Sequence, residues 1–466
     1  MIIYKKNRIC VAAAVTALGL LLAGCGVNQN ADIKENSSNQ ILENKAVEVT
    51  AEATAVYPVE PEFKSEDERM EYSRNKRMML PETFITAYHD FAVMTSAAVL
   101  KDSSENVVYS PLSLYYALAM VCDGAEGETQ EEMLDLLGYD TANALAEDCK
   151  TSFEALYHVP NEKNNKPNEW GEYDATSRYT MRFANSLWVD DVLELKKGYA
   201  DCVAQNFYAD VFKGDLQSDE TAKKKSEWVN ERTNGLIKPA EEPADMRTVL
   251  SVINTLYFYD EWLYRFAKEA TEADTFTLAD GSEVTCDYMN TINSSGGFRR
   301  GENYTASSLS LKNGAMVFVL PDEGVDVNEL TKDSATLVAA LGDGGESLYG
   351  RVTWKVPKFS YGSSLSLGYT LQTLGMESAF GEDAELGMIS DMEPLFISSV
   401  IQDTHLGIDE EGVEGAAYTE ILLCGAGLPK DEAEMILNRP FLYAVTNNGQ
   451  IVFVGICENP VENGAG

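Results

Sequence analysis

Strand-like and helical runs follow one another in irregular order between Pro81 and residue 460, and this order restricts the folds open to the chain. The helical spacing of apolar residues predicts helices over Thr83–Leu100, Ser110–Met120 and Glu128–Leu137. Strand-like runs occur at Tyr179–Val189, Thr248–Phe258, Ala315–Leu320, Arg351–Lys355, Phe396–Ile408, Phe441–Val445 and Ile451–Cys457. They show neither a strand–helix–strand repeat nor an internal period, so we predict an α+β fold.

The composition limits the partners of this fold. Hydrophobic residues make up 45% of the 466 residues, which is enough for a sizeable core. The formal net charge of −39 argues against nucleic acid as a partner, because phosphate binding requires clustered Lys and Arg. We therefore expect no nucleic-acid binding.

The first 25 residues have the order of an export signal. Lys5, Lys6 and Arg8 precede the apolar run Ile9–Leu22, which is short for a membrane-spanning helix. The run ends in Leu22-Ala-Gly-Cys25, which resembles a bacterial lipobox. We expect a signal peptide over residues 1–24, lipid on Cys25, and export to the bacterial cell envelope or surface with this lipid in the membrane. An uncleaved anchor helix and release to the extracellular space are the alternatives.

Residues 25–80 are poor in aromatics and rich in small and polar residues, which predicts a flexible tether. The sequence leaves open whether Glu66–Leu80 forms a helix. The globular domain is expected over residues 81–460, followed by a disordered tail over 461–466.

Cysteine and histidine show no metal-binding or catalytic pattern. Eight Cys are scattered without a C-x-x-C pair, and His89, His158 and His405 have no companion at ligand spacing. No hydrolase motif is present. We expect no metal, no cofactor and no enzymatic activity.

A set of collinear motifs resembles the serpin family. They include Asn106-Val-Val-Tyr-Ser-Pro-Leu-Ser113, Ala184-Asn-Ser-Leu-Trp188, Trp228-Val-Asn230, Pro357-Lys-Phe359, Asp409-Glu-Glu-Gly412 and Asn438-Arg-Pro-Phe441. The resemblance implies a monomeric, metastable fold with three β-sheets, about nine helices and an exposed reactive-centre loop. It also implies a suicide inhibitor, held in a covalent acyl complex with a serine protease while the cleaved loop enters the central sheet.

The same resemblance assigns residues to roles. The loop hinge is Glu410, Glu411, Gly412, Val413, Glu414, Gly415, Ala416 and Ala417. Counting from Gly412 places the scissile bond at Ala426–Gly427, which suits an elastase-like or subtilisin-like protease; counting back from Pro440 gives Pro429–Lys430. A cluster that controls sheet opening is expected at Ser110, Ser113, Asn185, Gln402 and Trp262, with Gln402 in place of the usual His.

The loop sequence itself is compatible with insertion as a strand. Alternate residues of a strand face opposite sides. One set is uncharged throughout: Val413, Gly415, Ala417, Thr419, Ile421 and Leu423. Both glutamates, Glu414 and Glu420, fall in the other set. Val413 and Tyr418 depart from the small residues usual in inhibitory members, so a non-inhibitory serpin serving as a surface binding or adhesion module is the alternative.

Overall fold

The computed structural model describes residues 49–161, 164, 179–413 and 431–461, which all belong to one unit of the chain, Val47–Gly466. Within those ranges it contains nine α-helices and sixteen β-strands in three sheets, which confirms the α+β fold class. The helices are α1 (Glu66–Arg77), α2 (Glu82–Leu100), α3 (Pro111–Asp123), α4 (Gly127–Leu137), α5 (Ala142–Leu156), α6 (Lys197–Asn206), α7 (Asp219–Arg232), α8 (Ser334–Leu341) and α9 (Gly368–Thr373).

The central layer consists of a five-stranded and a two-stranded sheet. The first has the order β1 (Thr50–Ala53), β4 (Ala209–Lys213), β3 (Thr180–Val189), β5 (Leu250–Glu261) and β13 (Gly412–Val413). The second pairs β11 (Phe359–Ser366) with β12 (Ile401–Ile408). β12 begins five residues later than the run from Phe396 predicts, because residues 396–400 form no strand.

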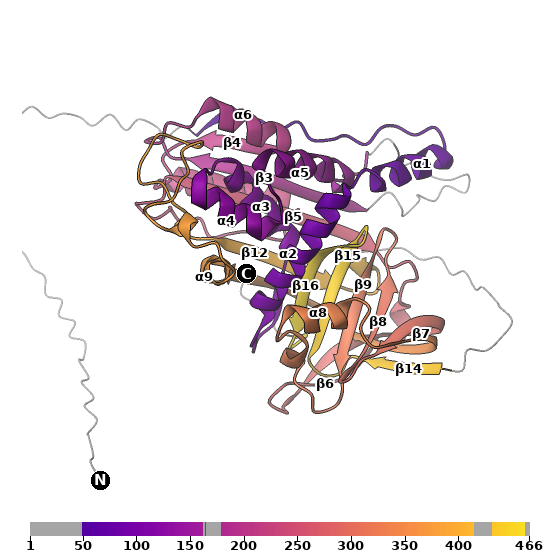
Figure 1. The fold of residues 1–466 in the computed structure, drawn as a ribbon. Coiled ribbons are helices and arrows are strands. Elements are labelled where there is room, and N and C mark those ends of the chain that lie inside the picture. The colour runs from indigo at the N-terminus through magenta and orange to yellow at the C-terminus, as the bar shows by residue number, and fades with distance from the viewer. Residues whose placement is uncertain (1–48, 162–163, 165–178, 414–430, 462–466) are drawn as a thin grey trace, which may run out of the picture. The chain divides into compact units, whose positions relative to one another are not determined.

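A nine-stranded sheet forms the second layer (Figure 1). Along its path lie β14 (Asp431–Ile436), β10 (Glu346–Pro357), β7 (Glu283–Arg300), β8 (Tyr304–Ser310), β9 (Gly314–Pro321), β15 (Phe441–Asn447), β16 (Gln450–Cys457) and β2 (Val107–Tyr109), and β6 (Glu272–Thr277) pairs with β7 beside this path. β15 and β16 are almost entirely buried, which explains why most of their residues are apolar.

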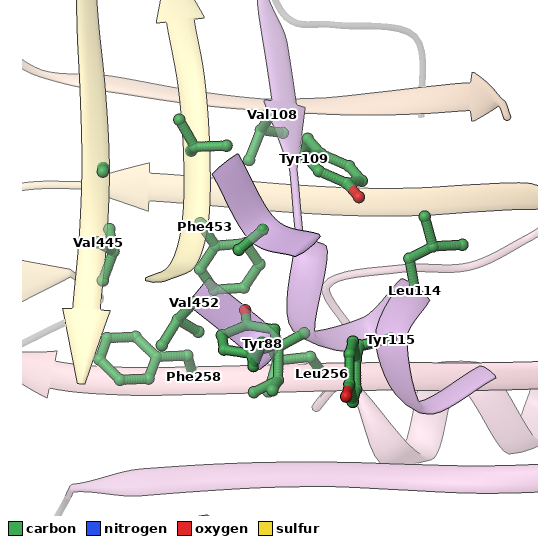
Figure 2. Packing of buried hydrophobic residues seen from close by; sticks show 14 of the residues in the cluster. Tyr88, Val108, Tyr109, Leu114, Tyr115, Leu256, Phe258, Val445, Val452 and Phe453 are labelled. Atoms are coloured by element: carbon green, nitrogen blue, oxygen red, sulfur yellow. The ribbon is translucent and has the colours of Figure 1, made fainter. Parts of the chain in front are cut away.

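The main core lies where α2 and α3 meet both layers. Figure 2 shows Tyr88 and Tyr115 of the helices beside Leu256 and Phe258 of β5, with Phe453 of β16 close by. Fully buried aromatics dominate this contact, since Tyr88 and Tyr115 stack edge to face at 5.4 Å.

α3 begins where the sequence predicts. Ser110 is its N-cap and accepts a hydrogen bond from the Ser113 amide at 3.3 Å, and Pro111 occupies the first turn, where a missing N–H has no cost.

α7 covers the outer face of the five-stranded sheet. Its Trp228 and Val229 form a second apolar cluster with Ala184 and Trp188 of β3. α7 is thereby packed directly on the strands of this sheet.

The boundary predicted between tether and domain is wrong. Residues 49–80 include β1, which pairs with β4 at the edge of the central sheet, and α1, with Ala55 and Leu80 buried in the main core. Their polar composition reflects an exposed edge strand and a surface helix, whose few inward residues are too sparse for a sequence pattern. Residues 25–48 and 462–466 lie outside the described residues, so the tether and tail there stay predictions.

In the part of the chain that the structure describes, no helix combines the length and apolar content required to cross a bilayer.

Candidate functional site

Among the described residues, β5 and β12 each have one neighbouring strand along most of their length, and β13 meets β5 at its end. β5 pairs with β3 on one side, and on the other its last residues, Asp260 and Glu261, pair with Val413 and Gly412. β12 pairs with β11 on its far side. The backbone turns between β12 and β13, where the Asp409 amide donates to the Gly412 carbonyl at 3.1 Å. β13 therefore lies at the end of β5, on the side of that strand opposite β3.

Ionic contacts hold the hinge glutamates beside this opening. The Glu410 carboxylate accepts hydrogen bonds from Thr271 Oγ1 at 2.8 Å and Lys358 Nζ at 3.1 Å. Burial raises the pKa of Glu410, but the bonds from Lys358 and Thr271 outweigh it and leave the pKa below its usual value. Glu411 pairs with Lys268 at 2.5 Å. Both hinge carboxylates thus lie against a lysine.

Gly412 and Val413 enter the ladder in a defined register. Gly412 pairs with Glu261 and Val413 with Asp260. A Cβ on Gly412 would lie 2.4 Å from the Asp260 carbonyl oxygen and 2.7 Å from Glu261 Cα, so glycine is required for this close approach. The Val413 side chain is only 1% exposed and packs into the main core.

Trp262 closes the end of the opening. Its indole Nε1 donates to the Asp409 carbonyl at 2.8 Å, and its backbone amide donates to the Glu411 carbonyl at 3.2 Å. The ring is buried and packs edge to face on Phe266 at 5.9 Å. Trp262 therefore binds the backbone of the hinge through two hydrogen bonds. The backbone amide of Phe266, its ring neighbour, donates to the Glu410 carbonyl.

Sequence reasoning missed a group of buried charges next to Trp262. Glu261 is 1% exposed and forms ion pairs with Arg265 at 3.0 Å and Lys312 at 2.5 Å. Asp260 accepts hydrogen bonds from the Asn313 amide at 2.8 Å and from Asn313 Nδ2 at 3.2 Å. Burial raises the pKa of Asp260 to about 6, although the Asn313 bonds act in the opposite direction. Asp-Glu directly before Trp262 was the available signal, since two acids ending an apolar strand require partners.

The five residues predicted to control sheet opening lie in three places. Gln402 forms a paired amide contact with the Ser110 backbone, accepting from its N–H and donating to its carbonyl, both at 2.9 Å. Ser110 Oγ donates to the Val452 carbonyl and caps α3 through Ser113. The predicted ability of Gln402 to donate and accept is therefore used, toward the backbone of Ser110.

Asn185 lies on the other side of the opening. Its Nδ2 donates to the Phe207 carbonyl at 2.5 Å, and its Oδ1 accepts from Asn254 Nδ2 at 2.5 Å. Among the described residues, the buried Oδ1 of Asn254 has no hydrogen-bond partner. Among the described residues, hydrogen bonds join Asn185 of β3 to Asn254 of β5, and Gln402 of β12 to Ser110 at the start of α3. The predicted cluster is therefore divided between the β5 side and the β12 side. Trp262 belongs to the hinge end.

Several predicted residues lie outside the described residues: Cys25, hinge positions Glu414, Gly415, Ala416 and Ala417, and the scissile pair Ala426 and Gly427. Their roles stay predictions. Within the described residues, no group of three or more His, Cys, Asp or Glu could hold a metal ion.

Comparison with known proteins decides the family. The family model for serpin (serine protease inhibitor) matches residues 86–460. The chain belongs to the serpin family. It is 29% identical to bovine (Bos taurus) serpin A3-6 over 384 residues, which is 80% of this chain and 87% of that protein.

Solved structures agree with this assignment. The thermophilic serpin tengpin in its native state matches with a TM-score of 0.69 and 26% identity, covering 87% of this chain and 97% of that chain. Thyroxine-binding globulin in complex with thyroxine shares the fold, with a TM-score of 0.63, 23% identity, and coverage of 82% and 99%. As a serpin, the chain belongs to a family of protease inhibitors.

The contact between Gln402 and Ser110 is expected to stabilise the closed site. Gln402→Leu keeps a similar volume but leaves the buried Ser110 N–H without its partner, at about 1–3 kcal/mol. It also removes one of two donors to the Ser110 carbonyl, which keeps the Leu114 amide at 3.3 Å, at about 0.5–1.5 kcal/mol. We expect the free energy of unfolding in urea to fall by about 2–4 kcal/mol. Gln372→Leu, at an exposed position, is the matched control and should change it little. Equal stability of both variants would contradict the assigned role of Gln402.

Asp260 is expected to make the stability of this serpin depend on pH. Its pKa is raised on folding from 3.8 to about 6, so its stabilising contribution is complete below pH 3.8 and is lost as pH rises through 6. Relative to Asp260→Asn, the wild type should lose about 3 kcal/mol of unfolding free energy between about pH 4 and 7. Urea unfolding at a series of pH values measures this, with Asp403→Asn, on an exposed strand position, as control. A difference between wild type and Asp260→Asn that does not vary with pH would contradict it.

Proposed function

We propose that this serpin is an irreversible inhibitor of serine proteases with small primary pockets, elastase-like or subtilisin-like. The protease serine attacks the Ala426 carbonyl, its ester bond forms, and the Ala426–Gly427 peptide bond breaks with Gly427 as the leaving amine. The loop then enters the central sheet as a strand between β5 and β12, and the protease is distorted before water can cleave the ester.

The observation that supports this proposal is the register at Val413. Continuing the pairs Gly412–Glu261 and Val413–Asp260 places Gly415 opposite Phe258 and Ala417 opposite Leu256, both in the main core. The uncharged set of the loop would therefore fill the core face, as a strand at this place requires. Thr419 would come opposite Asn254, whose buried Oδ1 has no partner among the described residues. A hydroxyl donor at that position would satisfy it.

The opposite face is less open than the sequence suggests. The other set would come opposite Tyr257 and Ile253, and Ile253 packs against the cluster under α7. Asn234, just after α7, donates to the Tyr257 hydroxyl at 3.3 Å. Side chains of an inserted strand that face α7 therefore require this helix to move away from the sheet. Side chains that face the core must be small and uncharged.

The hinge variants test the register. Ala417→Arg would bury an unpaired charge opposite Leu256, at a cost of several kcal/mol, and so slow insertion early enough for the protease to escape. Ala416→Arg makes the same chemical change on the α7 side, where a long side chain can reach water past the end of the helix. The measurement is the number of inhibitor molecules consumed per elastase inactivated. We expect a rise of at least about tenfold for Ala417→Arg and a much smaller one for Ala416→Arg.

The wild type in the same assay tests the function itself. A complex of protease and serpin that survives boiling in detergent is expected. Cleavage with free turnover would contradict inhibition and favour the alternative of a non-inhibitory binding module. An equal loss in the two Arg variants would show that the register is wrong.

We also propose that the protein is exported and held at a bacterial membrane by lipid on Cys25, on the strength of the basic, apolar leader and Leu22-Ala-Gly-Cys25. Cys25→Ser should release the protein or leave it unprocessed, because a serine hydroxyl cannot form the thioether. Membrane fractionation with mass measurement of the N-terminus measures this, and Cys10→Ser, within the leader, is the control. Normal processing with membrane retention in Cys25→Ser would contradict the proposal.

A further inference from the structure

The N-terminal segment Val49–Phe63, here called the strap, joins parts of the molecule that are distant in sequence. Its β1 pairs with the edge strand β4. Tyr57 then stacks on Tyr157 at 5.4 Å and on Tyr208 at 6.3 Å. The same ring packs against both the main core and the second cluster beneath α7. One side chain of the strap therefore bridges the two apolar clusters of the fold.

A buried carboxylate connects the strap to α7. Asp210 of β4 is 4% exposed and accepts hydrogen bonds from the Ala55 amide at 3.1 Å, Trp228 Nε1 at 3.2 Å and Arg232 Nη2 at 3.0 Å. The donors come from the strap and from two residues of α7. Tyr57 covers the Arg232 guanidinium, with 5.2 Å between ring centroid and Cζ. The C-terminal turn of α7 is thus held to the sheet edge underneath the strap.

The far end of the strap is held by a second buried carboxylate. Glu60 is 9% exposed and accepts hydrogen bonds from the Asn161 amide at 2.8 Å and Asn164 Nδ2 at 3.0 Å. The Phe63 amide donates to Asn164 Oδ1 at 2.9 Å. With both ends bonded, Tyr57 has little freedom to leave Arg232.

We propose that the strap restrains α7 on the central sheet and so slows entry of a strand between β5 and β12. This inference rests on the proposed function for its consequence, because the outer side chains of an entering strand would meet Tyr257 and Ile253 under α7. The restraint itself concerns only contacts among described residues. The strap thereby lengthens the lifetime of the uncleaved, active form and sets how readily the sheet opens.

The experiment compares Tyr57→Ala with Val59→Ala in the full chain. Val59 lies two residues away and is 80% exposed, so it controls for a change of the strap that touches no cluster. Amide hydrogen exchange over residues 219–232 reports the freedom of α7. The half-time for conversion of uncleaved protein to a form that resists urea unfolding reports spontaneous loop insertion. In Tyr57→Ala we expect the rate of amide exchange in α7 and the rate of conversion each to rise about tenfold. In Val59→Ala we expect neither rate to change.

Two further variants separate restraint from general damage. Tyr57→Phe keeps the ring and loses only a buried hydroxyl that has no partner among the described residues, so it should behave as wild type. Ala55→Pro removes the N–H that donates to Asp210 and should act like Tyr57→Ala through a different bond. Exchange that rises throughout the protein in Tyr57→Ala would show a global loss of stability and overturn the specific role.

The outcomes distinguish this inference from the proposed function. If amide exchange in α7 of Tyr57→Ala is unchanged, the proposal that the strap restrains α7 is wrong. Faster exchange in α7 without faster conversion overturns its effect on insertion. A wild type that fails to trap protease overturns the proposed inhibition, while faster exchange confined to α7 would still support the restraint, because that measurement involves no protease.

Discussion

The two-residue ladder between β13 and the end of β5 sets the geometry on which the rest of the site depends. It joins Gly412–Val413 to Glu261 and Asp260 and so fixes where the described chain ends before the loop. The ladder also determines which face each later loop residue would take, since side chains alternate along a strand. Gly412 makes the approach possible, and the burial of Val413 makes the register specific, because a shift by one residue would expose it.

Polar contacts around this ladder are numerous because the backbone carbonyls of residues 409–411 form no strand-to-strand hydrogen bonds and need other donors. Trp262 and Phe266 supply donors for the carbonyls of residues 409–411, and Lys358 and Lys268 neutralise the two hinge glutamates. Asp260 and Glu261 add two buried carboxylates that need Asn313, Arg265 and Lys312. Together these contacts hold the backbone before β13 against the end of β5.

The strap and the hinge lie on opposite sides of the same half of the sheet. β1 extends the edge at β4, and β13 occupies the edge at β5, with β3 between them. α7 packs over this half and is bonded to β3 through Arg182, which donates to the carbonyls of Glu231 and Arg232. A segment that the composition suggests is a tether is therefore packed on the same half of the sheet as α7. The predicted boundary fails because a four-residue strand with three exposed residues and a polar helix carry almost no hydrophobic pattern.

The sequence by itself determined the family, the α+β class, the start of α3 at Ser110 and the alternation of charge along the loop sequence, because each depends on contiguous residues or on the order of motifs. It also located strands with buried apolar runs, such as β3, β15 and β16, whereas β7, β8, β11 and β14 were missed because polar residues interrupt them. Only the tertiary structure decided that Gln402 bonds to Ser110 while Asn185 bonds to Asn254, and that Asp210 joins Ala55 to Arg232. These partners are separated by up to 292 residues along the chain, and which of them meet depends on strand order and register, which local periodicity does not specify.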